Sequence, residues 1–127
     1  MSDQFYQKVL MDHFKNPRNK RSVENHNFSS GKDNPACGDV ITMTGIIEDG
    51  VIKELGFEGS GCVVSQASVS MLTEKCAGMS TDDAMAMTKD DIVDMLGMEL
   101  GPNRLQCALL ALEALHKGIL EYLKKKE

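Results

Sequence analysis

The sequence predicts an α+β fold, a small antiparallel β-sheet of about three strands with helices packed on one face, in two layers. The main observation is a hairpin pattern. Residues 40–47, which are rich in β-branched side chains, and residues 51–57 are joined by Asp49-Gly50, a strong signal for a two-residue turn. Helical patterns then follow the strands along the chain instead of alternating with them, and this order is typical of α+β domains.

The first element we expect is a short amphipathic helix. Ser2 is a suitable N-cap, and the apolar residues after it have helical spacing until Asn16-Pro17 ends the pattern. Residues 18–33 are polar and show no period, so we expect a loop there with one edge strand near Phe28.

The second strand should lead directly into a helix. Small residues at 59–61 end the strand, and Cys62 opens a helix over residues 63–77 that Gly78 closes. Two short helices follow, because each of two hydroxyl residues is followed three positions later by an acid, which is typical of a helix start. These pairs are Ser80 with Asp83 and Thr88 with Asp91.

The last helix has the longest periodic pattern. It begins after Gly101-Pro102, and its apolar residues recur on one face while charged residues follow the other face at i, i+4 spacing. The apolar face consists of Leu105, Leu109, Leu112, Leu115, Ile119 and Leu123.

Length and charge limit the classes of function. The 127 residues are 42% hydrophobic and 26% charged, as in an ordinary globular protein, so we expect one domain over residues 1–127. The net charge is −5 and the one dense basic run is Lys124-Lys125-Lys126, so we expect no nucleic-acid partner. No apolar stretch approaches the roughly 20 residues that span a bilayer, and we expect no membrane partner and a cytoplasmic location.

Four cysteines in a cytoplasmic protein should be reduced, which leaves metal binding, catalysis or burial as their roles. They are Cys37, Cys62, Cys76 and Cys107, and none belongs to a C-x-x-C knuckle. Any metal site must therefore be assembled by the fold.

Cys37-Gly38-Asp39 presents a thiol and a carboxylate together from a loop tip, unless Asp39 is only a turn former and Cys37 only a small hydrophobe. Cys62 is expected at a helix N-terminus, where the dipole favours the thiolate. We expect Cys107 in the first turn of the last helix with the same advantage. For both Cys62 and Cys107, simple burial is the alternative.

Cys76 is expected to be structural. At 1.5 Å per residue it lies roughly 21 Å along the helix from Cys62, too far to share a metal ion with it. None of the three histidines, His13, His26 and His116, is placed as a natural fourth ligand.

The chain also carries four motifs in a fixed order: DHFKNPRN at residues 12–19, NPACGD at 34–39, GSGC with SQAS at 59–68, and LGPNRLQC at 100–107. Together they span nearly the whole chain. This set resembles the iron–sulfur cluster assembly scaffold family of IscU, SufU and the N-terminal domain of NifU. The resemblance implies an IscU/NifU-like fold.

The resemblance also implies a function and a site. A scaffold of this family takes persulfide sulfur from a cysteine desulfurase of the IscS or SufS type, binds iron, and passes a labile 2Fe-2S cluster to recipient or carrier iron–sulfur proteins. By resemblance the ligands are Cys37, Asp39, Cys62 and Cys107, with Cys107, or else Cys62, as the persulfide acceptor. We expect a scaffold rather than an enzyme, and a monomer or weak dimer. Thiolates suit iron–sulfur clusters and zinc, and one oxygen ligand makes the assembly more labile.

One departure from the IscU-like pattern suggests an alternative. Gln106 stands where IscU-like proteins have a histidine, and with Arg104 it is more similar to the SufU branch of zinc-binding sulfur acceptors, although the insertion of that branch between Cys62 and Cys107 is absent. The alternative function is a SufU-like zinc-dependent sulfur transferase that holds Zn²⁺ at the same residues. A third interpretation is a zinc ion that only supports folding.

The chaperone-binding stretch of IscU-like proteins is kept only in part. Leu100 and Pro102 match it, whereas Gly101 and Asn103 depart from it. The resemblance therefore does not imply a dedicated Hsp70-type chaperone as a partner.

Overall fold

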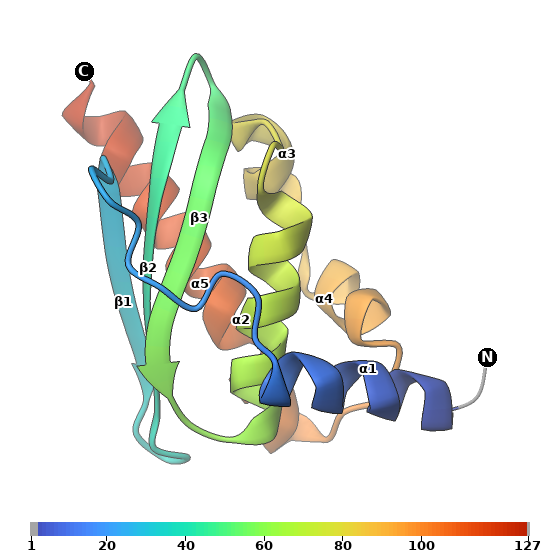
Figure 1. Cartoon of the computed structure of the whole chain (residues 1–127). Helices are drawn as coiled ribbons and strands as arrows, with labels where there is room; N and C mark the ends of the chain where they lie inside the picture. Colours follow the sequence, from blue (N-terminus) through green and yellow to red (C-terminus); the bar gives the residue numbers. More distant parts are fainter. Residues whose placement is uncertain (1–2, 127) are drawn as a thin grey trace.

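A computed structural model describes residues 3–126 (Figure 1). Five helices and three strands occur in this part of the chain. In order they are α1 (Asp3–Lys15), β1 (Phe28–Asn34), β2 (Asp39–Glu48), β3 (Val51–Ser60), α2 (Val63–Cys76), α3 (Thr81–Ala86), α4 (Lys89–Leu96) and α5 (Pro102–Lys125). The predicted α+β architecture is confirmed, and the Ser2 N-cap lies outside the described residues.

The three strands form one antiparallel sheet in the order β1-β2-β3. The tight turn at Asp49 and Gly50 has positive φ at both residues, as the hairpin signal predicted, and pairs Glu48 with Val51. The register shifts once, between Ile46 and Ile47. The hairpin joins the two longest strands, of which β2 is the central strand of the sheet and β3 an edge strand.

Helices α2 and α5 pack side by side on one face of the sheet, α2 against β3 and α5 against β1 and β2 (Figure 1). Close approach of α5 depends on Phe28, whose ring lies between Gly45 of β2 and Gly118 of α5. A Cβ at Gly45 would lie 2.4 Å from the Phe28 ring, and one at Gly118 would lie 2.7 Å from it. The two glycines thus leave room for an aromatic ring between sheet and helix.

The other face of the sheet is crossed by the segment between α1 and β1 (Figure 1). Asn19 O accepts a hydrogen bond from Phe57 N at 2.9 Å, and Val23 N donates to Thr44 Oγ1 at 2.9 Å. Val23 is 1% exposed. This loop therefore covers strand backbone and contributes an apolar side chain to the interior. Although its sequence has no helical or strand periodicity, the loop is held against the sheet by these contacts.

The predicted elements differ from the structure in two places. The edge strand expected near Phe28 is confirmed, but the loop expected around it is wrong over residues 29–33, because β1 runs from Phe28 to Asn34 and pairs with β2 over its whole length. Helix α2 ends at Cys76, and Gly78 follows with a φ of 90°. The helix starts at Ser80 and Thr88 are confirmed, since each side chain caps its helix.

Helix α1 packs across α2, while α3 and α4 contact α5. None of the helices within residues 3–126 is both long enough and apolar enough to cross a lipid bilayer.

Candidate functional site

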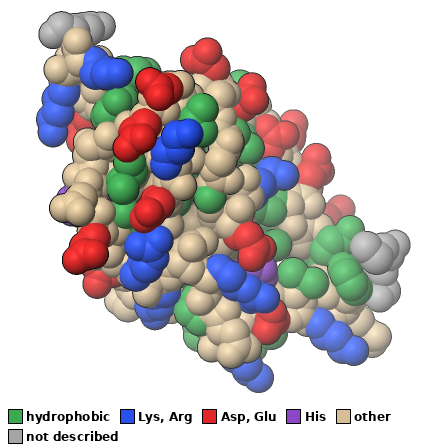
Figure 2. All heavy atoms as spheres, turned by 45° about the horizontal axis from the view of Figure 1, so that its top comes forward, with side chains coloured by type: hydrophobic (Ala, Val, Ile, Leu, Met, Phe, Trp, Pro, Cys, Tyr) green, Lys and Arg blue, Asp and Glu red, His purple; other side chains and the backbone are tan. Residues whose placement is uncertain are grey.

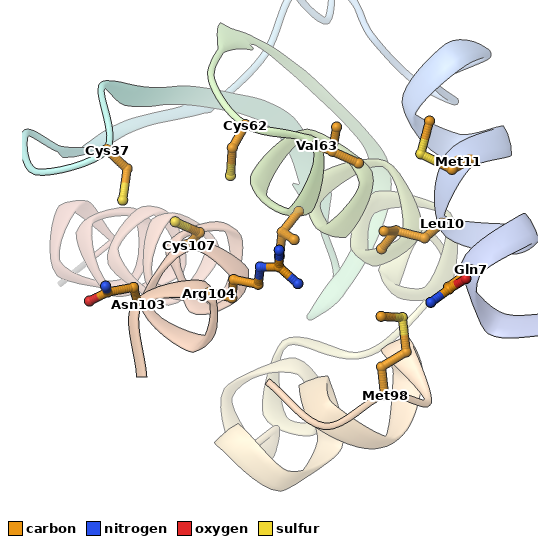
Figure 3. Close-up of a pocket in the computed structure, with 11 residues that line it drawn as sticks. Gln7, Leu10, Met11, Cys37, Cys62, Val63, Met98, Asn103, Arg104 and Cys107 are labelled. Carbon is orange, nitrogen blue, oxygen red and sulfur yellow. The ribbon is translucent and has the colours of Figure 1, made fainter. Parts of the chain in front are cut away.

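Three predicted ligands meet where the sheet and the two central helices end. The sulfur atoms of Cys37 and Cys107 and a carboxylate oxygen of Asp39 all lie within 4.8 Å of one another. Cys62 is not part of this mutually close group, but its Sγ lies 3.9 Å from Asp39 Oδ2. In Figure 3 the three sulfur atoms point toward a common space.

Cys37 lies in the turn that joins β1 to β2. The turn is closed by the Asn34↔Asp39 pair, and the Cys37 N–H donates to Asn34 O at 3.1 Å. Gly38 has a φ of 71°, a left-handed value that glycine adopts without strain. Cys37 is exposed, as expected for a loop tip.

Asp39 differs from the expectation of an exposed loop-tip carboxylate. It is the first residue of β2 and 0% exposed, because it lies beneath the start of α2. Its Oδ1 accepts hydrogen bonds from the Cys62 N–H at 2.8 Å and from Ser65 Oγ at 3.1 Å. Burial by itself would raise the pKa of Asp39, but hydrogen bonds from Cys107, Cys62 and Ser65 outweigh it and hold the pKa below its ordinary value. The carboxylate is therefore charged and fixed in place.

Cys62 is the N-cap of α2, as predicted. Its Sγ accepts a hydrogen bond from Ser65 N at 3.4 Å, so the sulfur lies at the positive end of the helix. The chain enters the cap through Gly61, where a Cβ would lie 2.2 Å from Asp39 Oδ1. Only glycine leaves room here for the carboxylate to reach the Cys62 amide.

Cys107 does not lie in the first turn of α5, and that prediction was wrong. The helix begins at Pro102, so Cys107 is in its second turn, beyond the free amides of the N-terminus. It is 3% exposed, and burial together with hydrogen bonds to Asp39, Cys37 and Cys62 raises the pKa of its thiol. Cation binding at this site must therefore displace the Cys107 proton.

Cys76 is remote from this cluster. It ends α2 at the opposite end from Cys62, is 0% exposed, and has its Sγ 3.5 Å from Met87 Sδ. Burial raises the pKa of its thiol to about 11.

The three histidines are not placed with the cysteines but form hydrogen bonds elsewhere. His13 binds Ser70, His26 binds Val23 O and His116 binds Ala84 O.

The thiols open into a mostly apolar cavity of about 570 Å³ (Figure 3). Residues from α1, the β1–β2 turn, the N-cap and first turn of α2, the segment before α5, and α5 itself line it. They are Gln7, Leu10, Met11, Cys37, Cys62, Val63, Val64, Met98, Asn103, Arg104 and Cys107. Among these residues Arg104 is the one with a positive charge. An anionic sulfur species could thus approach the thiols beside a guanidinium group.

The sequence reasoning missed two polar residues of the site. Ser65 binds Asp39, and Asn34 Nδ2 donates to Cys107 Sγ at 3.9 Å. Ser65 lies three residues after the capping Cys62, a spacing that places it in the first helical turn. Asn34 opens the NPACGD motif. Neither position reveals its partner, since both partners are distant along the chain.

Charged side chains of both signs lie close together on one face of the molecule. Figure 2 shows Lys and Arg side chains interspersed with Asp and Glu over the described part of the face that it draws. A mixed face of this kind lacks the one-signed field that tracks a phosphate backbone.

Comparison with known proteins identifies relatives along nearly the whole chain. The family model described as "NifU-like N terminal domain" matches residues 5–127. The chain is 37% identical to the zinc-dependent sulfurtransferase SufU of Bacillus subtilis, over 92% of this chain and 90% of that protein. It is 38% identical to the iron–sulfur cluster assembly scaffold protein IscU of Escherichia coli, over 96% of this chain and 97% of that protein.

A solved structure shares the fold. The crystal structure of FiSufU from Fervidobacterium islandicum AW-1 superimposes with a TM-score of 0.76 over 94% of this chain and 99% of that one, at 23% sequence identity.

Proposed function

Because this chain belongs to the NifU-like N-terminal domain family, we propose that it is a scaffold for iron–sulfur cluster assembly. It takes sulfur from a cysteine desulfurase of the IscS or SufS type, binds iron, and transfers a labile 2Fe-2S cluster to recipient proteins. The single observation that carries this proposal is the convergence of Cys37, Asp39 and Cys107, with Cys62 beside them, where the three cysteines line one cavity.

The donor set fits this cargo. We assign Cys37, Asp39, Cys62 and Cys107 as its ligands, because three thiolates are the preferred donors for iron–sulfur clusters and a carboxylate is a harder, more exchangeable fourth donor. The mixed exposure also suits a carrier. Cys37 is exposed, whereas Asp39 and Cys107 are buried. A cluster would therefore be held on its inner side by the buried ligands and be accessible to a partner protein on the side of Cys37.

Sulfur delivery requires one of the thiolates to attack the outer sulfur of the desulfurase persulfide. The new S–S bond forms on the acceptor cysteine, the donor S–S bond breaks, and the desulfurase cysteine leaves as a thiolate, so no external oxidant is needed. We propose Cys107 as the acceptor and Cys62 as the second candidate. Cys107 lines the cavity together with Arg104, but its thiol must first lose its proton. Persulfide trapping followed by peptide mass spectrometry distinguishes the two cysteines.

A second function is favoured by Gln106 and Arg104, and this chain is about as similar to SufU, at 37% identity, as to IscU, at 38%. In this alternative the same four residues hold Zn²⁺ as a resident ion, which would keep the thiolates deprotonated and ready for transfer. The chain would then deliver sulfur without building a cluster.

Anaerobic reconstitution with iron, cysteine and a desulfurase separates the two functions. A scaffold gains the visible absorption bands of a cluster, and loses them when a recipient apoprotein is added. A zinc-dependent transferase stays colourless, retains zinc by elemental analysis and accelerates the desulfurase. Zinc that only supports folding would give neither cluster bands nor a faster desulfurase reaction, and its removal would unfold the chain. Cys76→Ser is the matched control, because it removes a cysteine that lies outside the cluster.

We further propose that the chain acts in the cytoplasm as one domain, as a monomer or weak dimer. Sedimentation with and without the desulfurase tests the oligomeric state and the partner together.

A further inference from the structure

The two carboxylate oxygens of Asp39 have different surroundings. Oδ1 accepts hydrogen bonds from the Cys62 N–H at 2.8 Å and the Ser65 hydroxyl at 3.1 Å. Oδ2 lies 3.9 Å from the sulfur of Cys62, one of the proposed ligands. Oδ1 is thus occupied by protein donors, while Oδ2 is directed to the site.

The Ser65 hydroxyl has one proton and two acceptors within reach. Asp39 Oδ1 and Cys62 O each lie 3.1 Å from Ser65 Oγ. Cys62 O already accepts the Gln66 N–H at 3.1 Å, and a charged carboxylate is the stronger acceptor. The Gln66 side chain contributes as well, since its Nε2 donates to Ser65 Oγ at 3.4 Å. The proton of Ser65 is therefore directed to Asp39.

Two other serines of α2 show that this arrangement is specific. Ser65, Ser68 and Ser70 are all 0% exposed. The Ser70 hydroxyl binds His13 and the Arg18 amide, whereas the Ser68 hydroxyl has no hydrogen-bond partner within the described structure. A buried hydroxyl by itself is thus tolerated in this helix, and only that of Ser65 contacts a site carboxylate.

We propose that Ser65 is a positioning residue for the metal site: it holds Oδ1 of Asp39 so that Oδ2 alone faces the incoming metal ion or cluster. This inference rests on the proposed ligand role of Asp39. Partners of this kind fix the orientation of a metal-binding carboxylate, and losing one typically weakens metal affinity by about 10–100-fold.

The test measures Co²⁺ and Zn²⁺ binding, each metal alone, to the full chain under anaerobic conditions. We expect Ser65→Ala to weaken binding by about tenfold and to change the visible d–d bands of the Co²⁺ form, because the freed carboxylate can rotate or bind through both oxygens. Ser68→Ala removes a hydroxyl of equal burial from the same helix, and should leave affinity and spectrum unchanged. Equal behaviour of the two variants would overturn the proposal.

A double-mutant cycle with Asp39→Ala shows through which residue Ser65 acts. If Ser65 acts through Asp39, Ser65→Ala has no further effect on affinity or spectrum in the Asp39→Ala background. The same loss in both backgrounds would refute the positioning role. Should Ser65→Ala not fold, Ser65→Thr and Ser65→Val make the same comparison, because threonine and valine have the same shape and differ in the hydroxyl. We expect Ser65→Thr to keep the metal affinity and Ser65→Val to lose it. Equal affinities of the two variants would again overturn the proposal.

Failure of the inference differs from failure of the proposed function. A wild-type chain that binds neither metal would contradict the ligand set itself. A wild-type chain that binds both, with Ser65→Ala unchanged, would contradict only the role of Ser65.

Discussion

The ring of His13 and the hydroxyl of Ser70 form a buried hydrogen bond, with 2.8 Å between Nδ1 and Oγ, that joins α1 to α2. The same hydroxyl oxygen accepts the Arg18 N–H at 2.8 Å, so the Ser70 proton is free to point to Nδ1. This geometry suits a neutral imidazole. Since Leu10 and Met11 of α1 line the cavity beside the thiols, the contact also helps to hold one wall of the site.

His13 should make stability depend on pH. Burial lowers the pKa of His13 from 6.5, and Arg18 lowers it further, while Glu74 and Asp12 partly offset both. The unfolded chain therefore takes up a proton at higher pH than the native chain, so the free energy of unfolding falls as pH decreases below 6.5. Urea unfolding at several pH values tests this in the metal-free chain. His13→Asn should be less stable at neutral pH and show a flatter pH profile; an unchanged slope would contradict the assignment.

Gly97 should be intolerant of a side chain for two reasons. It ends α4 with a φ of 67°, and a Cβ there would lie 2.1 Å from the Tyr6 ring of α1. We expect Gly97→Ala to lower the free energy of unfolding by about 2–4 kcal/mol, from backbone strain and overpacking together. Denaturant unfolding measures the loss.

Gly78 provides the matched control. It also has a positive φ, 90°, but a Cβ at this position would have no other atom within 4 Å. Gly78→Ala should therefore lose only the strain component, about 1–2 kcal/mol. In a Tyr6→Ala background the difference between the two glycine variants should shrink, and a difference that persists would mean that the ring is not its cause.

Cys76 and Cys37 should show opposite effects. Cys76→Ser places a hydroxyl against Met87 in an apolar interior, so we expect a stability loss of about 1–3 kcal/mol with unchanged metal binding. Cys37→Ser changes an exposed turn residue, and should cost little stability but most of the metal affinity. Unfolding of the metal-free proteins and metal titration separate the two effects. Loss of metal binding in both variants would contradict the ligand set.

Local signals in the sequence predicted most of the fold, including an edge strand near Phe28, and the full length of β1 shows where they stop. The hairpin turn, the caps at Ser80 and Thr88, and the apolar face of α5 each depend on neighbouring residues. β1, with the sequence FSSGKDN, has little β-propensity, and forms because β2 offers a complete pairing edge and Phe28 fits between two glycines. Such long-range compensation leaves no local pattern.

The site was predicted to a similar degree. The resemblance to the scaffold family supplied the residues that converge, but the sequence pattern placed Cys107 one turn too early because Pro102 already begins the helix. The pattern also placed Asp39 at a loop tip and gave no sign of its burial, since burial of a carboxylate depends on donors that come from elsewhere, here Cys62 and Ser65. The supporting contacts of a site are the part that spacing alone cannot supply.

Asp39 should control how long a cluster is held. If the carboxylate is the exchangeable ligand, Asp39→Ala should keep a reconstituted cluster for longer than wild type, because three soft thiolates remain and the hard oxygen through which release begins is gone. Loss of the visible bands in the presence of a chelator or a recipient apoprotein measures the lifetime.

The control must separate charge from hydrogen bonding. Asp39→Asn retains an oxygen that can accept from the Cys62 amide and the Ser65 hydroxyl, but removes the negative charge. Asp39→Ala removes this acceptor, so the Cys62 amide loses its partner and Ser65 keeps only Cys62 O as an acceptor. If ligation by the charged carboxylate governs release, both variants should prolong the cluster, with Asp39→Asn the better folded of the two. Faster loss in Asp39→Asn would mean that the carboxylate stabilises the bound cluster, and the release role would have to be abandoned.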